Sequence, residues 1–89
     1  MELGDYRAQI DEIDHKLVEL FAKRMDVAAG IAAYKKEHGL PVLDPVRERE
    51  KLQKTVQSAP EALRDYTASL YSLLFELSRC YQNRLLGGD

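Results

Sequence analysis

The amino-acid sequence predicts an all-α chain of three helices, the first and third long and the second short. Only five Val, three Ile and two Thr occur in 89 residues, and these β-branched residues are the ones that strands favour. Leu, Ala, Glu and Lys, which favour helices, are frequent instead. Apolar residues also recur every three or four positions over long stretches, which is the spacing of one helix face.

Length and composition predict one folded domain over residues 1–89. Hydrophobic residues make up 45% and charged residues 31%, as in globular rather than disordered chains. The net charge of −2 argues against a nucleic-acid partner, and no apolar run approaches the roughly 20 residues of a membrane span. The single cysteine, Cys80, excludes an internal disulfide and a multi-cysteine metal site, and it fits a cytoplasmic location.

The first helix is expected over about residues 5–38, with Asp5 as its N-cap. It should end at Gly39, which suits a left-handed position after the last turn, and Pro41 follows. At 1.5 Å per residue, this helix is roughly 50 Å long. Its apolar stripe consists of Tyr6, Ile10, Ile13, Leu17, Leu20, Val27, Ile31 and Tyr34.

The second helix is expected over about residues 45–57, because Asp44 is a good N-cap and a proline follows it. The third is expected over about residues 59–86. Ser58 and Glu61 have the spacing of a capping box, with Ser58 as N-cap. Leucines and tyrosines at helical spacing then form one apolar stripe along this third helix.

The length of the first helix predicts an obligate homodimer. A compact chain of this size has a radius of gyration near ~12 Å, so a helix of roughly 50 Å must project from it. Its stripe would then be bare unless a partner covers it, and a bare stripe of this length indicates a second copy of the chain. The run of small residues at positions 28–33 supports the close approach of another helix.

Arg24 interrupts the apolar stripe, and Lys35 lies eleven residues further on. The two differ by only ~20° around the helix and lie about 16 Å apart, so both could lean toward one ligand. Taken alone, an arginine at this position more often snorkels to the surface or pairs with a buried carboxylate. Arg7 lies roughly 26 Å from Arg24, beyond the reach of one small ligand within a chain. Arg7 could approach the partner's Arg24 in an antiparallel dimer, or it is an ordinary first-turn arginine.

Two further polar groups accompany these cations. Asp44, Arg47 and Glu48 lie near the start of the second helix, where free backbone N–H groups favour polar ligands, although such a run is usually a solvated face. Ser78 and Gln82 are four residues apart and share a face of the third helix. That face either meets solvent or has a polar partner.

The combination of cations with neutral donors favours a small, highly anionic ligand. The sequence has no recognisable Ser–His pair, no metal-ligand spacing and no glycine-rich phosphate loop, so we expect neither a metal nor a cofactor. His15 and His38 are expected at the surface. Cys80 is expected to be a packed small residue, because no base lies near it in the sequence.

Three segments closely resemble the all-helical chorismate mutases, such as the mutase domain of bacterial bifunctional chorismate mutase/prephenate dehydratases. They are YRAQIDEIDHKLVELFAKRMDVAAGIAAYKK, LPVLDPVRERE and ELSRCYQNRL, and they extend from about Arg7 to Arg84. The resemblance implies an intertwined homodimer of three-helix chains that converts chorismate to prephenate by a Claisen rearrangement. It implies two sites, each completed by an arginine of the other chain.

The resemblance also implies a role for each matched residue. Arg7 would be the arginine lent to the partner's site, and Arg24 would bind a carboxylate within its own chain. Lys35 and Gln82 would donate hydrogen bonds to the ether oxygen of the substrate. Such a rearrangement needs no acid, base, nucleophile, metal or cofactor, so the protein would act by holding the dianionic substrate and stabilising charge.

The remaining matches concern the ring of the substrate. Glu48, with Arg47 and the backbone near Asp44, would hold the ring hydroxyl, and Ser78 would lie near the ring carboxylate. The family motif does not dictate the neighbouring residues Phe75, Arg79 and Tyr81. Two other functions stay open: an isochorismate pyruvate lyase, which binds a similar dianion, and a non-catalytic helical dimerisation module, which would leave Arg24 unexplained.

Overall fold

The chain folds into three helices, which confirms the all-α prediction. The structure, a computed structural model, describes residues 1–87. It contains α1 (Leu3–Glu37), α2 (Pro45–Ser58), the short 3₁₀ helix η1 (Glu61–Leu63) and α3 (Arg64–Leu85), and no strand occurs in this part of the chain.

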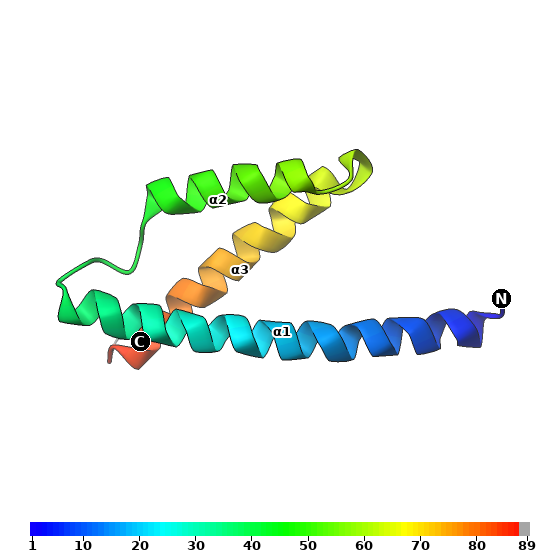
Figure 1. The fold of residues 1–89 in the computed structure, drawn as a ribbon, viewed down its shortest axis with the longest axis horizontal. Helices are drawn as coiled ribbons and strands as arrows, with labels where there is room; N and C mark the ends of the chain where they lie inside the picture. The colour runs from blue at the N-terminus through cyan, green and yellow to red at the C-terminus, as the bar shows by residue number, and fades with distance from the viewer. Residues whose placement is uncertain (88–89) are drawn as a thin grey trace.

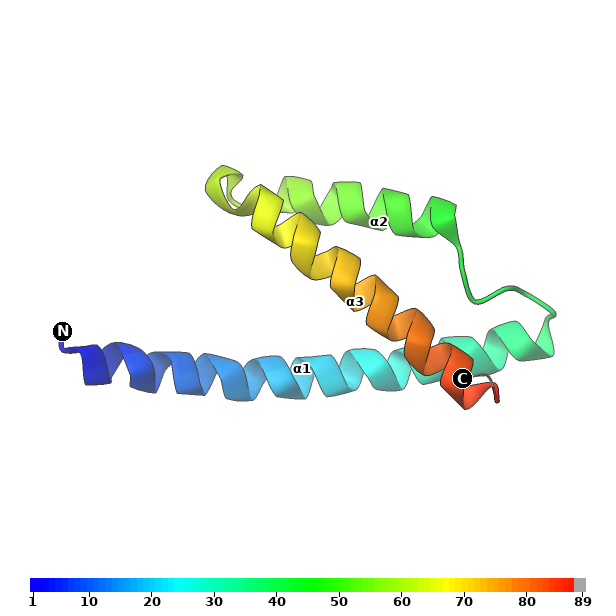
Figure 2. The ribbon, with the colours of Figure 1, turned by 180° about the vertical axis from the view of Figure 1, so that it is seen from behind.

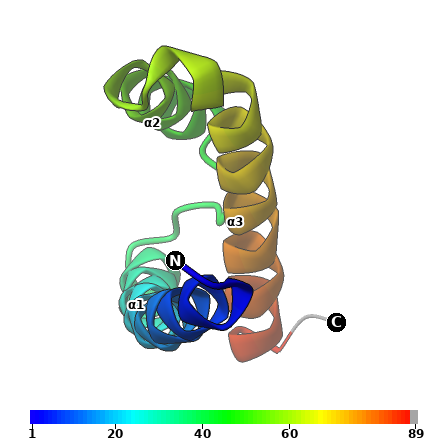
Figure 3. The same ribbon diagram turned by 90° about the vertical axis from the view of Figure 1, so that its right-hand side faces the viewer.

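Helix α3 holds the other two helices together. It runs diagonally from the end of α2 to the C-terminal half of α1, and both α1 and α2 pack against it (Figure 1). The view from behind shows the same crossing, with the N-terminal part of α1 extending alone (Figure 2). Seen end-on, the helices form an open C with α3 as its back (Figure 3).

Helix α1 begins earlier than its sequence predicted. Its N-cap is Glu2, and Asp5 lies at N3, where its Oδ2 accepts a hydrogen bond of 2.8 Å from the Glu2 N–H. The prediction of Asp5 as N-cap is therefore wrong, because Asp5 belongs to a reciprocal capping box that starts three residues before it. At the other end, Gly39 has φ +66°, as its place after the helix predicted.

The start of α2 is the one predicted, whereas the start of α3 is not. Asp44 Oδ1 accepts from the Arg47 N–H at 3.0 Å, which confirms Asp44 as N-cap. Ser58 instead ends α2, and its hydroxyl donates to the Thr55 carbonyl at 2.7 Å. The predicted capping box is therefore wrong, and α3 begins at Arg64, whose Nε donates to the Ala59 carbonyl at 3.3 Å.

The single chain is elongated and leaves much of α1 bare. Its radius of gyration is 16.1 Å and its extents are 54 × 25 × 18 Å, larger than the ~12 Å radius of a compact chain. Along α1, Tyr6, Ile10, Ile13 and Leu17 are all more than half exposed. The bare stripe expected for an isolated chain is present, and the homodimer stays a prediction. No helix among residues 1–87 is long and apolar enough to cross a membrane.

Two small residues of the run at positions 28–33 are buried within the single chain, where α1 packs against α3, so this run does not by itself support the predicted dimer. Ala28 and Ala32, one turn apart on α1, are 3% and 1% exposed, and α1 packs against α3. Small side chains allow the two backbones to approach closely. In the described part of the chain, the only other buried residue is Gln82 on α3. Cys80 is exposed, so the prediction that it is packed is wrong for the single chain. This crossing of α1 and α3 therefore fixes the end of the molecule where the polar residues of both helices gather.

Candidate active site

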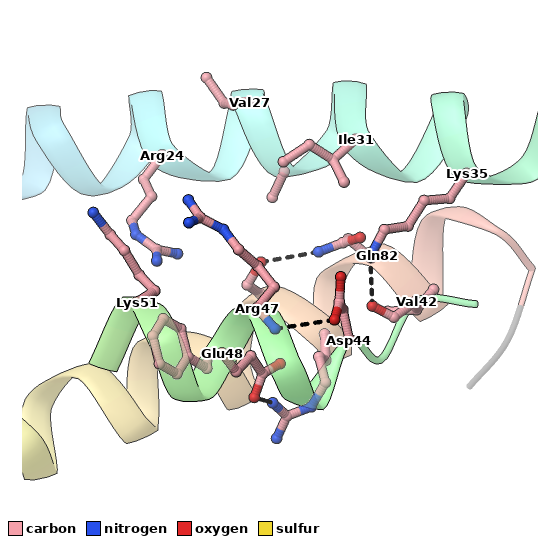
Figure 4. A pocket seen from close by; sticks show the side chains of 14 residues that line it. Arg24, Val27, Ile31, Lys35, Val42, Asp44, Arg47, Glu48, Lys51 and Gln82 are labelled. Carbon is pink, nitrogen blue, oxygen red and sulfur yellow. Dashed lines mark hydrogen bonds and ion pairs between the residues drawn. The ribbon is translucent and has the colours of Figure 1, made fainter. Parts of the chain in front are cut away.

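A cavity of about 380 Å³ lies between the C-terminal half of α1, the start of α2 and the second half of α3 (Figure 4). Its volume falls within the range of small-molecule pockets. It is lined by Arg24, Val27, Ala28, Ile31, Lys35, Val42, Asp44, Arg47, Glu48, Lys51, Phe75, Ser78, Arg79 and Gln82.

Seven of the eight residues singled out in the sequence line this cavity: Arg24, Lys35, Asp44, Arg47, Glu48, Ser78 and Gln82. The eighth, Arg7, does not. It is exposed in the second turn of α1, near the free end that extends away from α2 and α3 (Figure 2). Within one chain, the structure thus leaves Arg7 far from the other candidate residues.

The two α1 cations point into the cavity from one helix face, as their spacing predicted (Figure 4). The Arg24 guanidinium lies 5.8 Å from the centre of the Phe75 ring on α3, within range of a cation–π interaction. Lys35 Nζ donates to the Val42 carbonyl at 2.7 Å. This bond ties the last turn of α1 to the loop that leads into α2, and it leaves Lys35 with further N–H donors.

Helix α3 contributes a buried amide. Gln82 is 6% exposed, and its Nε2 donates to Ser78 Oγ at 3.0 Å. Its Oε1 is buried without a hydrogen-bond partner in the described part of the chain. A 180° turn of the amide exchanges its oxygen and nitrogen, so that Oε1 could accept from the Ser78 hydroxyl and the N–H group would be free. A buried polar atom without a partner is costly, which makes this amide ready for a polar ligand.

Helix α2 places one carboxylate opposite an arginine of α3. Glu48 forms an ion pair with Arg79, and their side chains are 26% and 31% exposed. The Asp44 carboxylate is engaged in capping α2. Both acidic groups of the cavity thus have a structural partner.

The lining is strongly cationic. Five of its residues are cations and two are carboxylates, which leaves an excess of three positive charges on a chain whose net charge is −2. Among residues 1–87, no group of three His, Cys, Asp or Glu side chains could hold a metal ion. This arrangement can bind a small anion through several donors at once.

Comparison with known proteins places the chain in a family. Residues 6–83 match the family model described as chorismate mutase type II, which is most of the chain. The chain belongs to this family. No solved structure matches it at a significant level.

Three relatives illustrate its place among the type II chorismate mutases. A chorismate mutase of Methanocaldococcus jannaschii is 42% identical over 54% of this chain and 48% of its own length. A 4-amino-4-deoxychorismate mutase of Streptomyces venezuelae is 39% identical over 52% and 45%. A bifunctional chorismate mutase/prephenate dehydratase of Buchnera aphidicola is 32% identical over 91% and 22%. The chain spans less than half the length of each relative.

Three charged or aromatic lining residues were not among the candidates from sequence: Lys51, Phe75 and Arg79. Helical spacing could have found them. Lys51 lies four residues after Arg47, and Phe75 and Arg79 share one α3 face with Gln82. Spacing alone does not show that this face meets α2, because that depends on how the two helices cross.

Proposed function

We propose that this chain is a chorismate mutase that converts chorismate to prephenate. The observation that supports this most is the cavity in which five cations and a buried amide surround space for one small molecule. Chorismate is a dianion, so such a lining would attract it and hold both of its carboxylates. Membership of the type II family supports the same reaction.

The rearrangement would be promoted by restraint and by charge stabilisation. Chorismate is flexible, and a site that holds its compact conformer brings the two carbon atoms that form the new bond together. As the ether C–O bond breaks, negative charge grows on the oxygen. We assign Lys35 and Gln82 as donors to that oxygen, because both line the cavity and Gln82 is buried, where preorganised donors are most effective.

The other lining residues would hold the rest of the substrate. Arg24 would bind one carboxylate, and Glu48 would accept from the ring hydroxyl, with Arg47 and the start of α2 beside it. Ser78 would lie near the ring carboxylate. Of these, Arg24 is held against Phe75 and Glu48 against Arg79, so their side chains are oriented before the substrate arrives.

We further propose that the site is completed in a homodimer, within a single mutase domain over residues 1–89. The bare stripe on α1 supports a second copy as the partner, because one copy's stripe would cover the other's. In an antiparallel pairing of the two α1 helices, the partner's Arg7 would approach the cavity. A cytoplasmic location is proposed as well, which the single cysteine supports.

The direct test follows chorismate by its absorbance and identifies the product. Saturable formation of prephenate by the purified protein is expected. Release of pyruvate from isochorismate, with no prephenate from chorismate, would instead assign the chain as the lyase. A folded dimer that converts neither compound and does not bind a bicyclic dianionic transition-state mimic would indicate a dimerisation module.

Mixing two inactive variants tests the role of Arg7. R7A and R24A homodimers should each be nearly inactive. A hybrid dimer has one site with both lesions and one with neither, so refolding an equal mixture should restore about a quarter of the wild-type rate, since half of the dimers are hybrids. R24A mixed with K35A is the matched control, because each lesion then damages its own chain's site and no intact site forms. Equal rates in the two mixtures would contradict a shared site.

A further inference from the structure

The ion pair between Glu48 and Arg79 joins two helices inside the cavity wall. Both residues line the cavity, one from α2 and one from α3, and they are 31 positions apart in the sequence. Arg79 Nη1 donates to Glu48 Oε1. Among residues 1–87, no other protein group donates to this carboxylate, so Oε2 remains available as an acceptor.

The pairing changes what the Glu48 carboxylate can attract. An unpaired carboxylate that is mostly removed from water binds an ammonium group far better than a neutral hydroxyl. Beside a guanidinium, most of its charge is compensated, and it keeps the ability to accept one hydrogen bond from a neutral O–H. The cations Arg47 and Lys51 on the same helix add to the repulsion of a positive group at this place.

We propose that Arg79 determines specificity: by compensating Glu48, it makes the site select a substrate with a hydroxyl rather than an ammonium group at that ring position. This inference rests on the proposed function and on Glu48 as the residue facing the ring hydroxyl. The competing compound class is 4-amino-4-deoxychorismate, in which an amine replaces that hydroxyl. A relative carries this compound in its name, so the family scaffold accommodates both chemistries.

A purely structural role for Arg79 makes a different prediction. If Arg79 only holds α2 against α3, its loss should weaken binding and turnover of both compounds equally. If it sets the charge seen by the substrate, its loss should change their ratio, because only one of the two carries a positive charge at that place.

The test compares wild-type protein with R79M, R79K and R84M. R79M removes the charge and keeps an apolar stem, whereas R79K keeps a charge. R84M makes the same substitution at an exposed position of α3 outside the cavity lining. The measurement is kcat/KM for 4-amino-4-deoxychorismate divided by kcat/KM for chorismate. We expect R79M to raise this ratio about tenfold or more, and R79K and R84M to keep the wild-type ratio.

A wild-type ratio in R79M would overturn the inference, and so would an equal rise in R79K. If R79M does not fold, as judged by circular dichroism, R79Q replaces it, and the same rise in the kcat/KM ratio is expected of R79Q. If wild-type protein converts neither compound, the ratio is taken from dissociation constants measured by calorimetry. Failure of the wild-type protein to bind either compound would overturn the proposed function itself, whereas chorismate turnover with an unmoved ratio would overturn only the role of Arg79.

Discussion

Lys35 is a cation whose charge should matter strongly for the rate. It lines the cavity and is held by the Val42 carbonyl, so its ammonium group is in place before charge develops on the substrate. We expect K35A to lower kcat/KM by about 10²-fold or more, which corresponds to ~3 kcal/mol of lost transition-state stabilisation. Steady-state kinetics with chorismate measure this.

The neighbouring residue gives the control for Lys35. K36A removes the same charge from an exposed position outside the cavity and should keep wild-type kinetics. R24A should behave like K35A, and both variants should keep wild-type helical content. Near-normal turnover in K35A and R24A would contradict the assignment of the site.

Gln82 should reveal its role through pH. A carboxyl group at this buried position can donate a hydrogen bond only when it is protonated, and its protonated fraction increases as pH falls. We therefore expect Q82E to be nearly inactive at neutral pH and to gain activity steadily toward acid pH. Q53E, on an exposed part of α2, should follow the wild-type profile. The same profile in both variants would exclude Gln82 as a donor to the ether oxygen.

At the scale of the elements, the N-cap of α2 should stabilise the fold as well as position the start of this helix in the cavity wall. The Asp44 carboxylate accepts from the Arg47 N–H, and substitution of such a cap by alanine commonly costs ~1 kcal/mol. We expect D44A to lower the free energy of unfolding in urea by about that amount, and D44S to retain most of it because serine also caps helices. Equal losses in D44A and D44S would show that the cap is not the cause.

Local signals predicted some helix ends and missed others for a physical reason. Asp44 could be recognised because its cap joins groups three residues apart. Ser58 does not cap α3 as predicted. Instead Arg64, from the following helix, donates hydrogen bonds to the carbonyls of Ala59 and Gln57 and so completes the end of α2. Such a contact bridges two elements, and a pattern within one helix does not contain it.

The same distinction applies to the candidate site: features within one helix could be predicted from the sequence, and contacts between helices could not. Spacing along α1 correctly gave the shared face of Arg24 and Lys35, since both belong to one rigid helix. The pairing of Glu48 with Arg79 could not be predicted, because it requires the crossing of α2 and α3. Sequence patterns thus predicted which faces are polar, and the packing of the helices determined which faces meet.

For the whole molecule, the bare α1 stripe is where association should be tested. L17E places a charge in the middle of this stripe, at a residue that is 56% exposed in the single chain. We expect it to shift the protein from dimer to monomer in analytical ultracentrifugation and to abolish turnover, because an uncompensated charge in an apolar interface is costly. K23E, an exposed polar position outside the stripe and the cavity lining, should remain dimeric and active. A dimeric, fully active L17E would contradict the proposed interface.

Arg7 lies far from the cavity of its own chain, which is 54 Å long. The catalytic activity per chain should therefore depend on the protein concentration. If neither chain holds a whole site, only dimers are active, and at low concentration the total rate rises with the square of the protein concentration. When the protein concentration is below the dissociation constant of the dimer, halving that concentration would nearly halve the activity per chain, because the dimeric fraction also nearly halves. A small change in expression would then be amplified in the flux through the reaction, with no effector required.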